Sequence, residues 1–118
     1  MRYVLLINAA EELYAKMSEA EMNTLMAGYG QFTGELQAAG AMEAGERLRD
    51  VETATTVRVR DGKIQTTDGP FAETKEQLGG YYVIKAKNLD EAIAWAAKIP
   101  CGAIGSVEVR PIWENGEE

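Results

Sequence analysis

Apolar and polar positions divide the chain into segments with the periods of strands and helices. Residues 2–8 are almost entirely apolar, which is typical of a strand buried on both faces. A long helix is predicted to start at the S-x-x-E capping box of Ser18 and Glu21. It should run to about Ala39, where Gly40 stops it. Its core face, at spacings of three and four, comprises Met22, Leu25, Met26, Tyr29, Phe32 and Leu36.

A second stripe, made of small residues, runs beside that apolar face. It consists of Ala27, Gly30, Gly34 and Ala38. Because an interior glycine costs a helix about 1 kcal/mol, we expect a close contact to compensate. A tightly packed neighbouring helix would explain the stripe, and so would a ligand or a partner subunit.

The middle of the chain predicts extended structure. Residues 41–49 form a weaker extended segment, whereas residues 55–60 alternate cleanly between two faces. Asp61-Gly62 has the composition of a type I′ turn, so residues 63–67 should pair back as the second strand of a hairpin.

Two further strands and a helix complete the pattern. Strands are expected over residues 81–87 and 106–113. Between them, Asn88 and Glu91 have the spacing of a helix start, and Pro100 breaks that helix.

With the hairpin set aside, the element order is βαββαβ, which is the ferredoxin-like plan of an α+β fold: an antiparallel sheet with both helices on one face. The other face would be uncovered. Arg58, Glu108 and Arg110 are predicted to lie there beside Tyr81 or Tyr82, a mixture that suits neither water nor a closed core. Two such sheets stacked face to face would bury the apolar parts and enclose a polar cavity. We therefore expect a homodimer.

Composition narrows the class of protein. The 118 residues suit a single domain over 1–118, large enough to bury one core. A net charge of −7 argues against nucleic acid or an anionic membrane surface as a partner, because phosphate binding needs clustered Lys and Arg. No apolar run is long enough to cross a bilayer, so a cytoplasmic protein is expected.

The residue types that are absent exclude several chemistries. The chain has no His, which excludes Ser-His-Asp and Cys-His catalysis and histidine metal sites. Its single cysteine, Cys101, excludes an internal disulfide. We expect no cofactor and no tightly bound metal. Acid–base chemistry would fall to carboxylates, Lys, Tyr or Cys.

The segment 68–82, DGPFAETKEQLGGYY, is the most distinctive part of the chain, and we call it the signature segment. Asp68 is the first candidate catalytic residue, as a general acid/base or a ligand anchor at the mouth of the cavity. Its alternative role is to cap the turn at Pro70. The pair Gly79-Gly80 enters a strand and predicts a bulge or a close backbone approach.

Other residues of the signature segment could complete a site. Glu73 would supply a second carboxylate, and two carboxylates in unlike environments can divide acid and base roles. Phe71 would form a wall of the substrate site. Lys75 could hold an anionic substrate, or it could form a surface ion pair with its acidic neighbours.

The strands supply the remaining candidates for substrate binding. Glu108 and Arg110 share one strand face, so Arg110 would be a fixed cation for a carboxylate-bearing ligand if that face lines the cavity. An ion pair between the two is the alternative. Tyr81 and Tyr82 point to opposite faces, so at most one lines the cavity. Tyr82 and Arg58 complete the candidate set.

Over essentially its whole length the chain resembles the DGPF domain family, part of the YCII-related proteins. The matching stretches are MRYVLLI at 1–7, AGYGQFTGEL at 27–36, TATTVRVRDGK at 53–63, the signature segment, and GSVEVRPIWE at 105–114. The resemblance implies a dimeric α+β barrel with a cavity near the signature segment. It also implies a His–Asp pair in one branch of the family, of which only Asp68 can be matched here, and an association with extracytoplasmic-function sigma factors.

Two functions follow from these observations. The first is a non-catalytic module that binds a small molecule or supports a transcription regulator such as a sigma factor. The second is a cofactor-free enzyme that acts on a small organic acid, with proton transfer through Asp68 and Glu73. The lack of a complete catalytic set favours the binding module.

Overall fold

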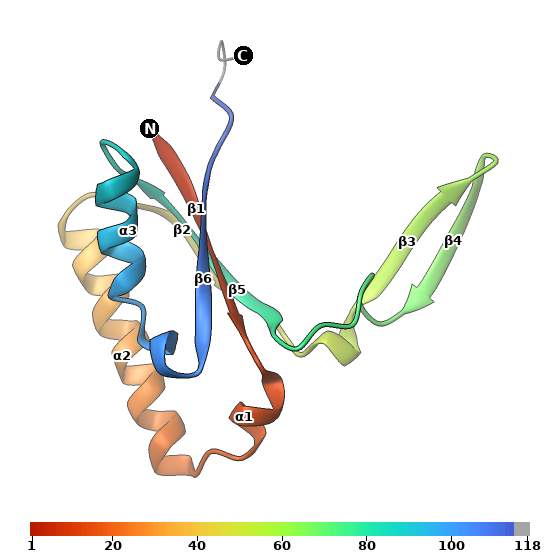
Figure 1. Cartoon of the computed structure of the whole chain (residues 1–118), viewed down its shortest axis with the longest axis horizontal. Coiled ribbons are helices and arrows are strands. Elements are labelled where there is room, and N and C mark those ends of the chain that lie inside the picture. Colours follow the sequence, from red (N-terminus) through yellow and green to blue (C-terminus); the bar gives the residue numbers. More distant parts are fainter. Residues whose placement is uncertain (115–118) are drawn as a thin grey trace.

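A four-stranded antiparallel sheet in the order β2-β5-β1-β6 carries both long helices on one face (Figure 1). The structure is a computed structural model that describes residues 1–114. This order and connectivity are compatible with the predicted ferredoxin-like plan. The strands are β1 (Arg2–Ala9), β2 (Met42–Arg47), β5 (Gln77–Lys85) and β6 (Gly105–Pro111), and the helices are α2 (Glu19–Ala38) and α3 (Leu89–Ala97).

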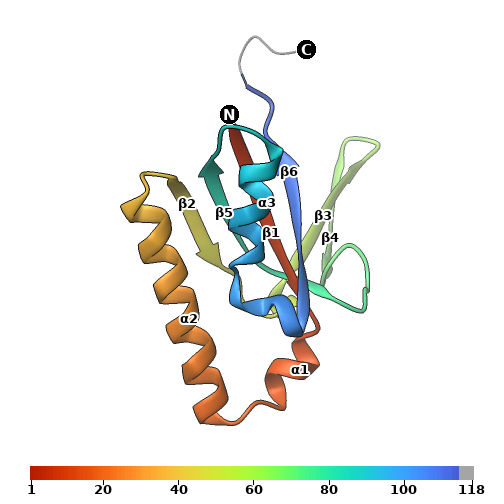
Figure 2. The same ribbon diagram turned by 60° about the vertical axis from the view of Figure 1, so that its left-hand side comes forward.

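The core lies between this sheet and the two helices. In β1 the side chains of Tyr3, Leu5 and Ile7 are buried, and those between them are only partly covered. Leu5 pairs with Tyr82 on one side and with Val109 on the other, so these three share the helix face. The expectation that β1 is buried on both faces therefore does not hold within the single chain, because its second face has no layer above it (Figure 2).

The predicted helix caps are confirmed. Ser18 and Glu21 form the reciprocal capping box of α2, and Asn88 Oδ1 accepts a hydrogen bond from the Glu91 backbone N–H at 3.0 Å at the start of α3. The small-residue stripe of α2 is different. A Cβ atom at Gly30 or Gly34 would meet nothing within 4 Å, so no neighbouring helix packs on the stripe in the described chain.

The predicted hairpin forms but leaves the body of the protein. Strands β3 (Thr55–Arg60) and β4 (Lys63–Asp68) make a separate two-stranded sheet, which we call the arm, and both views show it standing apart (Figures 1 and 2). Asp61 and Gly62 have φ of 52° and 74°, as a type I′ turn requires. The arm raises the radius of gyration to 16.4 Å, against about 13–14 Å for a compact chain of this length.

Three short helices were not predicted: α1 (Glu11–Ala15), η1 (Val51–Thr53) and η2 (Pro100–Ala103). Glu11, the first residue of α1, makes hydrogen bonds to β5 and to η1. Its backbone N–H donates to Gln77 Oε1 at 2.8 Å, and its carboxylate accepts from the Val51 N–H at 3.0 Å. The base of the arm is therefore held to the end of β1. No helix in residues 1–114 has the length and apolar character that crossing a membrane would need.

Candidate functional site

Asp68 lies at the end of the arm, where its carboxylate is exposed and has no hydrogen-bond partner within residues 1–114. The turn that follows is held by other groups. The Gly69 N–H donates to the Ala54 carbonyl at 2.7 Å, and the Thr56 hydroxyl donates to the Gly69 carbonyl at 2.8 Å. The Asp68 carboxylate is thus neither used as a cap nor desolvated in the single chain.

Residues 71–76 of the signature segment are also open to solvent. The Phe71 side chain is 82% exposed, and neither Glu73 nor Lys75 joins an ion pair among the described residues. Glu76 accepts a hydrogen bond from the Ser106 hydroxyl at 2.7 Å, which ties the end of the loop to β6. One chain alone therefore does not enclose a cavity around these residues.

The predicted close approach at Gly79-Gly80 is confirmed. The pairing of β1 with β5 shifts register opposite Gly79, which is a bulge. A Cβ atom at Gly80 would lie 2.8 Å from the Glu46 carbonyl oxygen of β2. The double glycine therefore serves strand packing in the sheet.

The sheet face that points away from the helices, which we call the open face, holds two of the predicted residues together. Arg110 Nε donates to Glu108 Oε2 at 2.7 Å, and the two side chains form an ion pair. Arg58 lies on the arm, apart from this pair. The open face comprises Val4, Leu6, Tyr81, Val83, Ser106, Glu108 and Arg110.

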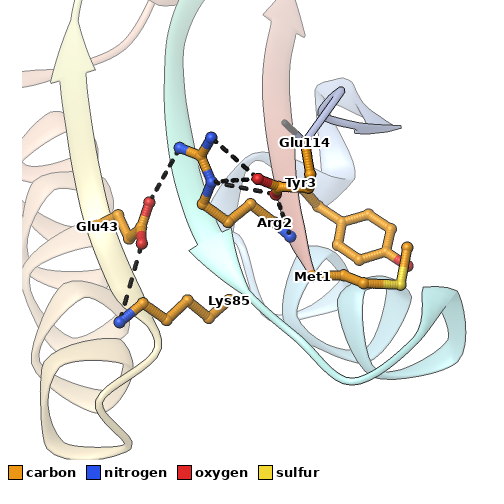
Figure 3. A network of polar contacts seen from close by, with 6 residues as sticks. All are labelled: Met1, Arg2, Tyr3, Glu43, Lys85 and Glu114. Carbon is orange, nitrogen blue, oxygen red and sulfur yellow. Dashed lines mark hydrogen bonds and ion pairs between the residues drawn. The ribbon is translucent and has the colours of Figure 1, made fainter. Parts of the chain in front are cut away.

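A polar network around Arg2 joins neighbouring strands at one end of the main sheet (Figure 3). Arg2 Nε donates to Glu114 at 3.2 Å, and its Nη1 lies 3.3 Å from Glu43, which also lies 3.8 Å from Lys85 Nζ. The hydrogen bond from Arg2 lowers the pKa of Glu114. The network links the start of β1 to β2 and to Glu114, beyond the end of β6. Its contribution to stability is small, because the groups are partly exposed to solvent.

The structure holds a cavity that sequence reasoning missed. A pocket of about 310 Å³, which we call the helix-side pocket, lies on the other side of the sheet, under α1 and α2. Ile7, Met26 and Met42 give it an apolar lining. The polar part of its lining comes from the hydroxyl-bearing residues Tyr14, Tyr29, Thr33 and Tyr82 together with Gln77 and the charged residues Glu11, Glu46, Arg47 and Asp50.

Tyr82 has a fixed position in this pocket. Its hydroxyl is 2.9 Å from Thr33 Oγ1, and its ring meets Phe32 edge to face at 5.1 Å between centroids. A Cβ atom at Gly45 would lie only 2.7 Å from the Tyr82 ring, so the glycine is needed for the ring to lie across β2. Tyr82 thus lines the helix-side pocket, and Tyr81 is the tyrosine of the open face.

Two further tyrosines in the pocket are held in their protonated form. Burial raises the pKa of Tyr29 far above its ordinary value, and burial also raises the pKa of Tyr14, although the charge of Arg47 partly opposes that shift. Burial raises the pKa of the neighbouring Cys101 thiol as well. Near neutral pH these groups can donate hydrogen bonds but do not supply a base.

The end of the signature segment contributes Gln77, Gly79, Gly80, Tyr81 and Tyr82 to this pocket, but the other lining residues come from four further elements and share no motif. The sequence predicts Tyr29 as part of the core face of α2. Its hydroxyl group was the available signal of a polar cavity, because a buried tyrosine usually needs a hydrogen-bond partner. Among the described residues no group of three or more Cys, Asp or Glu side chains could hold a metal ion.

Comparison with known proteins identifies the family. The family model described as the YCII-related domain matches residues 1–115, and the chain belongs to this family. An uncharacterized protein of Rhizobium meliloti (strain 1021) is 35% identical over 114 residues, which cover 95% of this chain and 92% of that protein. The resemblance drawn from the signature segment is thereby confirmed.

Proposed function

We propose that this YCII-related protein binds a small organic molecule in the helix-side pocket. The observation that carries the proposal is the cavity of about 310 Å³, which a single chain builds from a largely apolar lining with a few hydroxyl-bearing and charged residues. Small-molecule sites have this character and volumes of about 300–1,000 Å³. The rigid packing of Tyr82 against Phe32 and Thr33 supports a site that exists before the ligand arrives.

Binding is favoured over catalysis by the titratable groups of the pocket. The phenols of Tyr14 and Tyr29 stay protonated, and the Glu11 carboxylate is engaged by the Val51 N–H. An enzyme that uses Asp68 and Glu73 would need a second chain to close a cavity over them, because both are exposed here. The enzyme alternative therefore stays a prediction that depends on dimer formation.

We further propose a homodimer in which two open faces pack together and complete a dimeric α+β barrel. Val4, Leu6, Tyr81 and Val83 form a partly covered apolar centre on that face, with the Glu108–Arg110 pair beside it. Apolar centres with polar rims are typical of such interfaces. Sedimentation equilibrium at micromolar concentration tests the dimer, and a monomer there would remove both the barrel and its shared cavity.

An accessory role beside a sigma factor, which the family resemblance implies, also stays a prediction. The acidic surface of the chain suits contact with a basic protein segment better than contact with DNA. Co-purification of the tagged protein with a sigma factor from its own host, lost at raised salt, is the expected result. A salt-independent absence of any such complex would contradict it.

A thermal-shift screen of small organic molecules tests the binding function, since a ligand that binds only the folded state raises the Tm. Met26→Trp places a bulky side chain in the pocket lining and should abolish the shift. Ile93→Trp is the matched control, because Ile93 is half exposed on α3 and does not line the pocket. Equal shifts in both variants would show that the ligand binds elsewhere.

A further inference from the structure

We infer that the ligand of the helix-side pocket is a small organic carboxylate, bound through the guanidinium of Arg47 at the mouth of the pocket. The inference rests on the proposed function of the pocket and names its class of ligand. It follows from the charges that line the cavity and from the partners that those charges already have.

Arg47 is the cation among the described residues that line the pocket. It ends β2 opposite Gly80, two residues after Gly45 and therefore on the same, helix-facing side of the strand. Its Nη1 lies 3.8 Å from the Met26 sulfur of α2, which places the guanidinium across the gap between the sheet and the helix.

The guanidinium of Arg47 has few partners. A thioether is a weak acceptor, so most of its five N–H donors are available. Within residues 1–114 no ion pair forms between Arg47 and any carboxylate. Arg110, in contrast, is paired with Glu108, and Arg2 is paired with Glu43 and Glu114. Arg47 is thus the arginine that combines a cavity with unused donors.

The acidic residues of the lining form no ion pair with Arg47. The Glu11 carboxylate is turned to the Val51 N–H at 3.0 Å. Glu46 pairs with Tyr81 in the strand register, so its side chain lies on the open face, and its backbone reaches the pocket. Asp50 is exposed and makes no ion pair with Arg47. None of the three carboxylates is paired with Arg47, so its guanidinium is available to an anionic ligand.

The hydroxyl groups fit an anion as well. Tyr14 lies close enough to Arg47 for the charge to affect its pKa, and protonated phenols donate hydrogen bonds to a carboxylate. Below them, Ile7, Met42 and the Tyr82 ring offer an apolar surface to the body of the ligand. The pocket therefore matches a molecule with one carboxylate and a small apolar body. Planar, bidentate recognition of carboxylate is the contact for which arginine is best suited.

The test uses pairs of acids and their amides, with benzoate and benzamide as the first pair and hexanoate and hexanamide as the second. Titration calorimetry of the full chain should show at least tenfold tighter binding of the acids. Arg47→Gln should remove that preference while leaving amide binding within twofold, and Arg47→Lys should keep part of it. Arg60→Gln, at the end of β3 in the arm and outside the pocket lining, is the matched control and should leave both affinities unchanged.

The outcomes separate this inference from the proposed function. Amides that bind as tightly as the acids, in a manner that Met26→Trp blocks, would overturn the carboxylate inference and leave the binding function standing. No binding by any acid or amide would overturn the carboxylate inference, and the function would then depend on the wider screen. Loss of acid binding in Arg110→Gln instead of Arg47→Gln would place the anion site on the open face. Thermal unfolding of each variant confirms that its fold is intact.

Discussion

The body of this protein and its arm use apolar side chains in opposite ways. In the body, Leu5, Phe32 and Leu36 are completely or almost completely buried between sheet and helices. In the arm, the Val57 and Ile64 side chains are 58% and 75% exposed. A two-stranded hairpin with no covering layer has marginal stability in water. The body therefore has a hydrophobic core of its own, whereas the arm exposes apolar surface that another chain could cover.

The two regions also differ in the kind of site that each can offer. The body encloses the helix-side pocket with residues of a single chain. The arm and the signature segment next to it present Asp68, Phe71 and Glu73 to solvent. The exposed first part of the signature segment and the formed cavity thus lie in different parts of the molecule, although the end of the segment, from Gln77 to Tyr82, contributes to the cavity lining. The predictions below test whether function follows the cavity or the motif.

The largest expected effect is on the stability of the body. Phe32→Ala should lower the free energy of unfolding by about 3–5 kcal/mol, because it empties the contact with Tyr82 and Trp95. Val59→Ala in the arm should change it by less than about 0.5 kcal/mol in the monomer. Urea unfolding at low protein concentration measures both. A cost for Val59→Ala that appears only at high concentration would show the arm docked on a second chain.

Two glycines provide a second comparison. Gly45→Ala forces the Tyr82 ring to move, because a Cβ atom would lie 2.7 Å from it. The substitution should lower the free energy of unfolding by about 1–3 kcal/mol and should also weaken ligand binding in the pocket. Gly30→Ala, in an open position of α2, should instead stabilise by about 0.5–1 kcal/mol. Thermal unfolding measures both. Two effects of the same sign would contradict the packing described here.

Helices and strands of both the body and the arm could be predicted from sequence because local signals determine them. The box of Ser18 and Glu21, the Asp61-Gly62 turn and the Asn88 cap each act within four residues, and all three form. The helix-side pocket could not be predicted in this way. Its residues are separated by up to 75 positions, from Ile7 to Tyr82, and each one read alone is an ordinary core or surface residue.

The position of the arm relative to the main sheet also could not be predicted from the sequence. The hairpin pattern predicts that residues 55–60 and 63–67 pair with each other, but nothing in it says whether the pair joins the main sheet. For the same reason Asp68 could be predicted as a turn residue, and its solvent exposure could not. Long-range packing determines both the position of the arm and the exposure of Asp68, and that packing depends on side chains outside residues 55–68.

A smaller effect is expected at alkaline pH. Burial raises the pKa of Tyr29 above its ordinary value of 10.0, so the unfolded chain releases this proton before the folded chain does. The stabilisation is therefore complete below pH 10 and is lost as the pH rises beyond it. Urea unfolding between about pH 9 and 11 should show a steeper loss of stability in the wild type than in Tyr29→Phe. Identical slopes would mean that the phenol is exposed to water.

The smallest expected effect concerns Asp68, and it decides between motif and cavity. The carboxylate has no hydrogen-bond partner in the described chain, and backbone groups of Ala54 and Gly69 hold the turn. Asp68→Asn should therefore change the free energy of unfolding by less than about 0.5 kcal/mol. If the ligand binds in the helix-side pocket, calorimetric titration with benzoate should give an affinity within twofold of wild type, whereas Arg47→Gln should lose it. An Asp68→Asn protein that folds and dimerises normally but no longer binds would place the site at the signature segment, inside a cavity that only two chains can close.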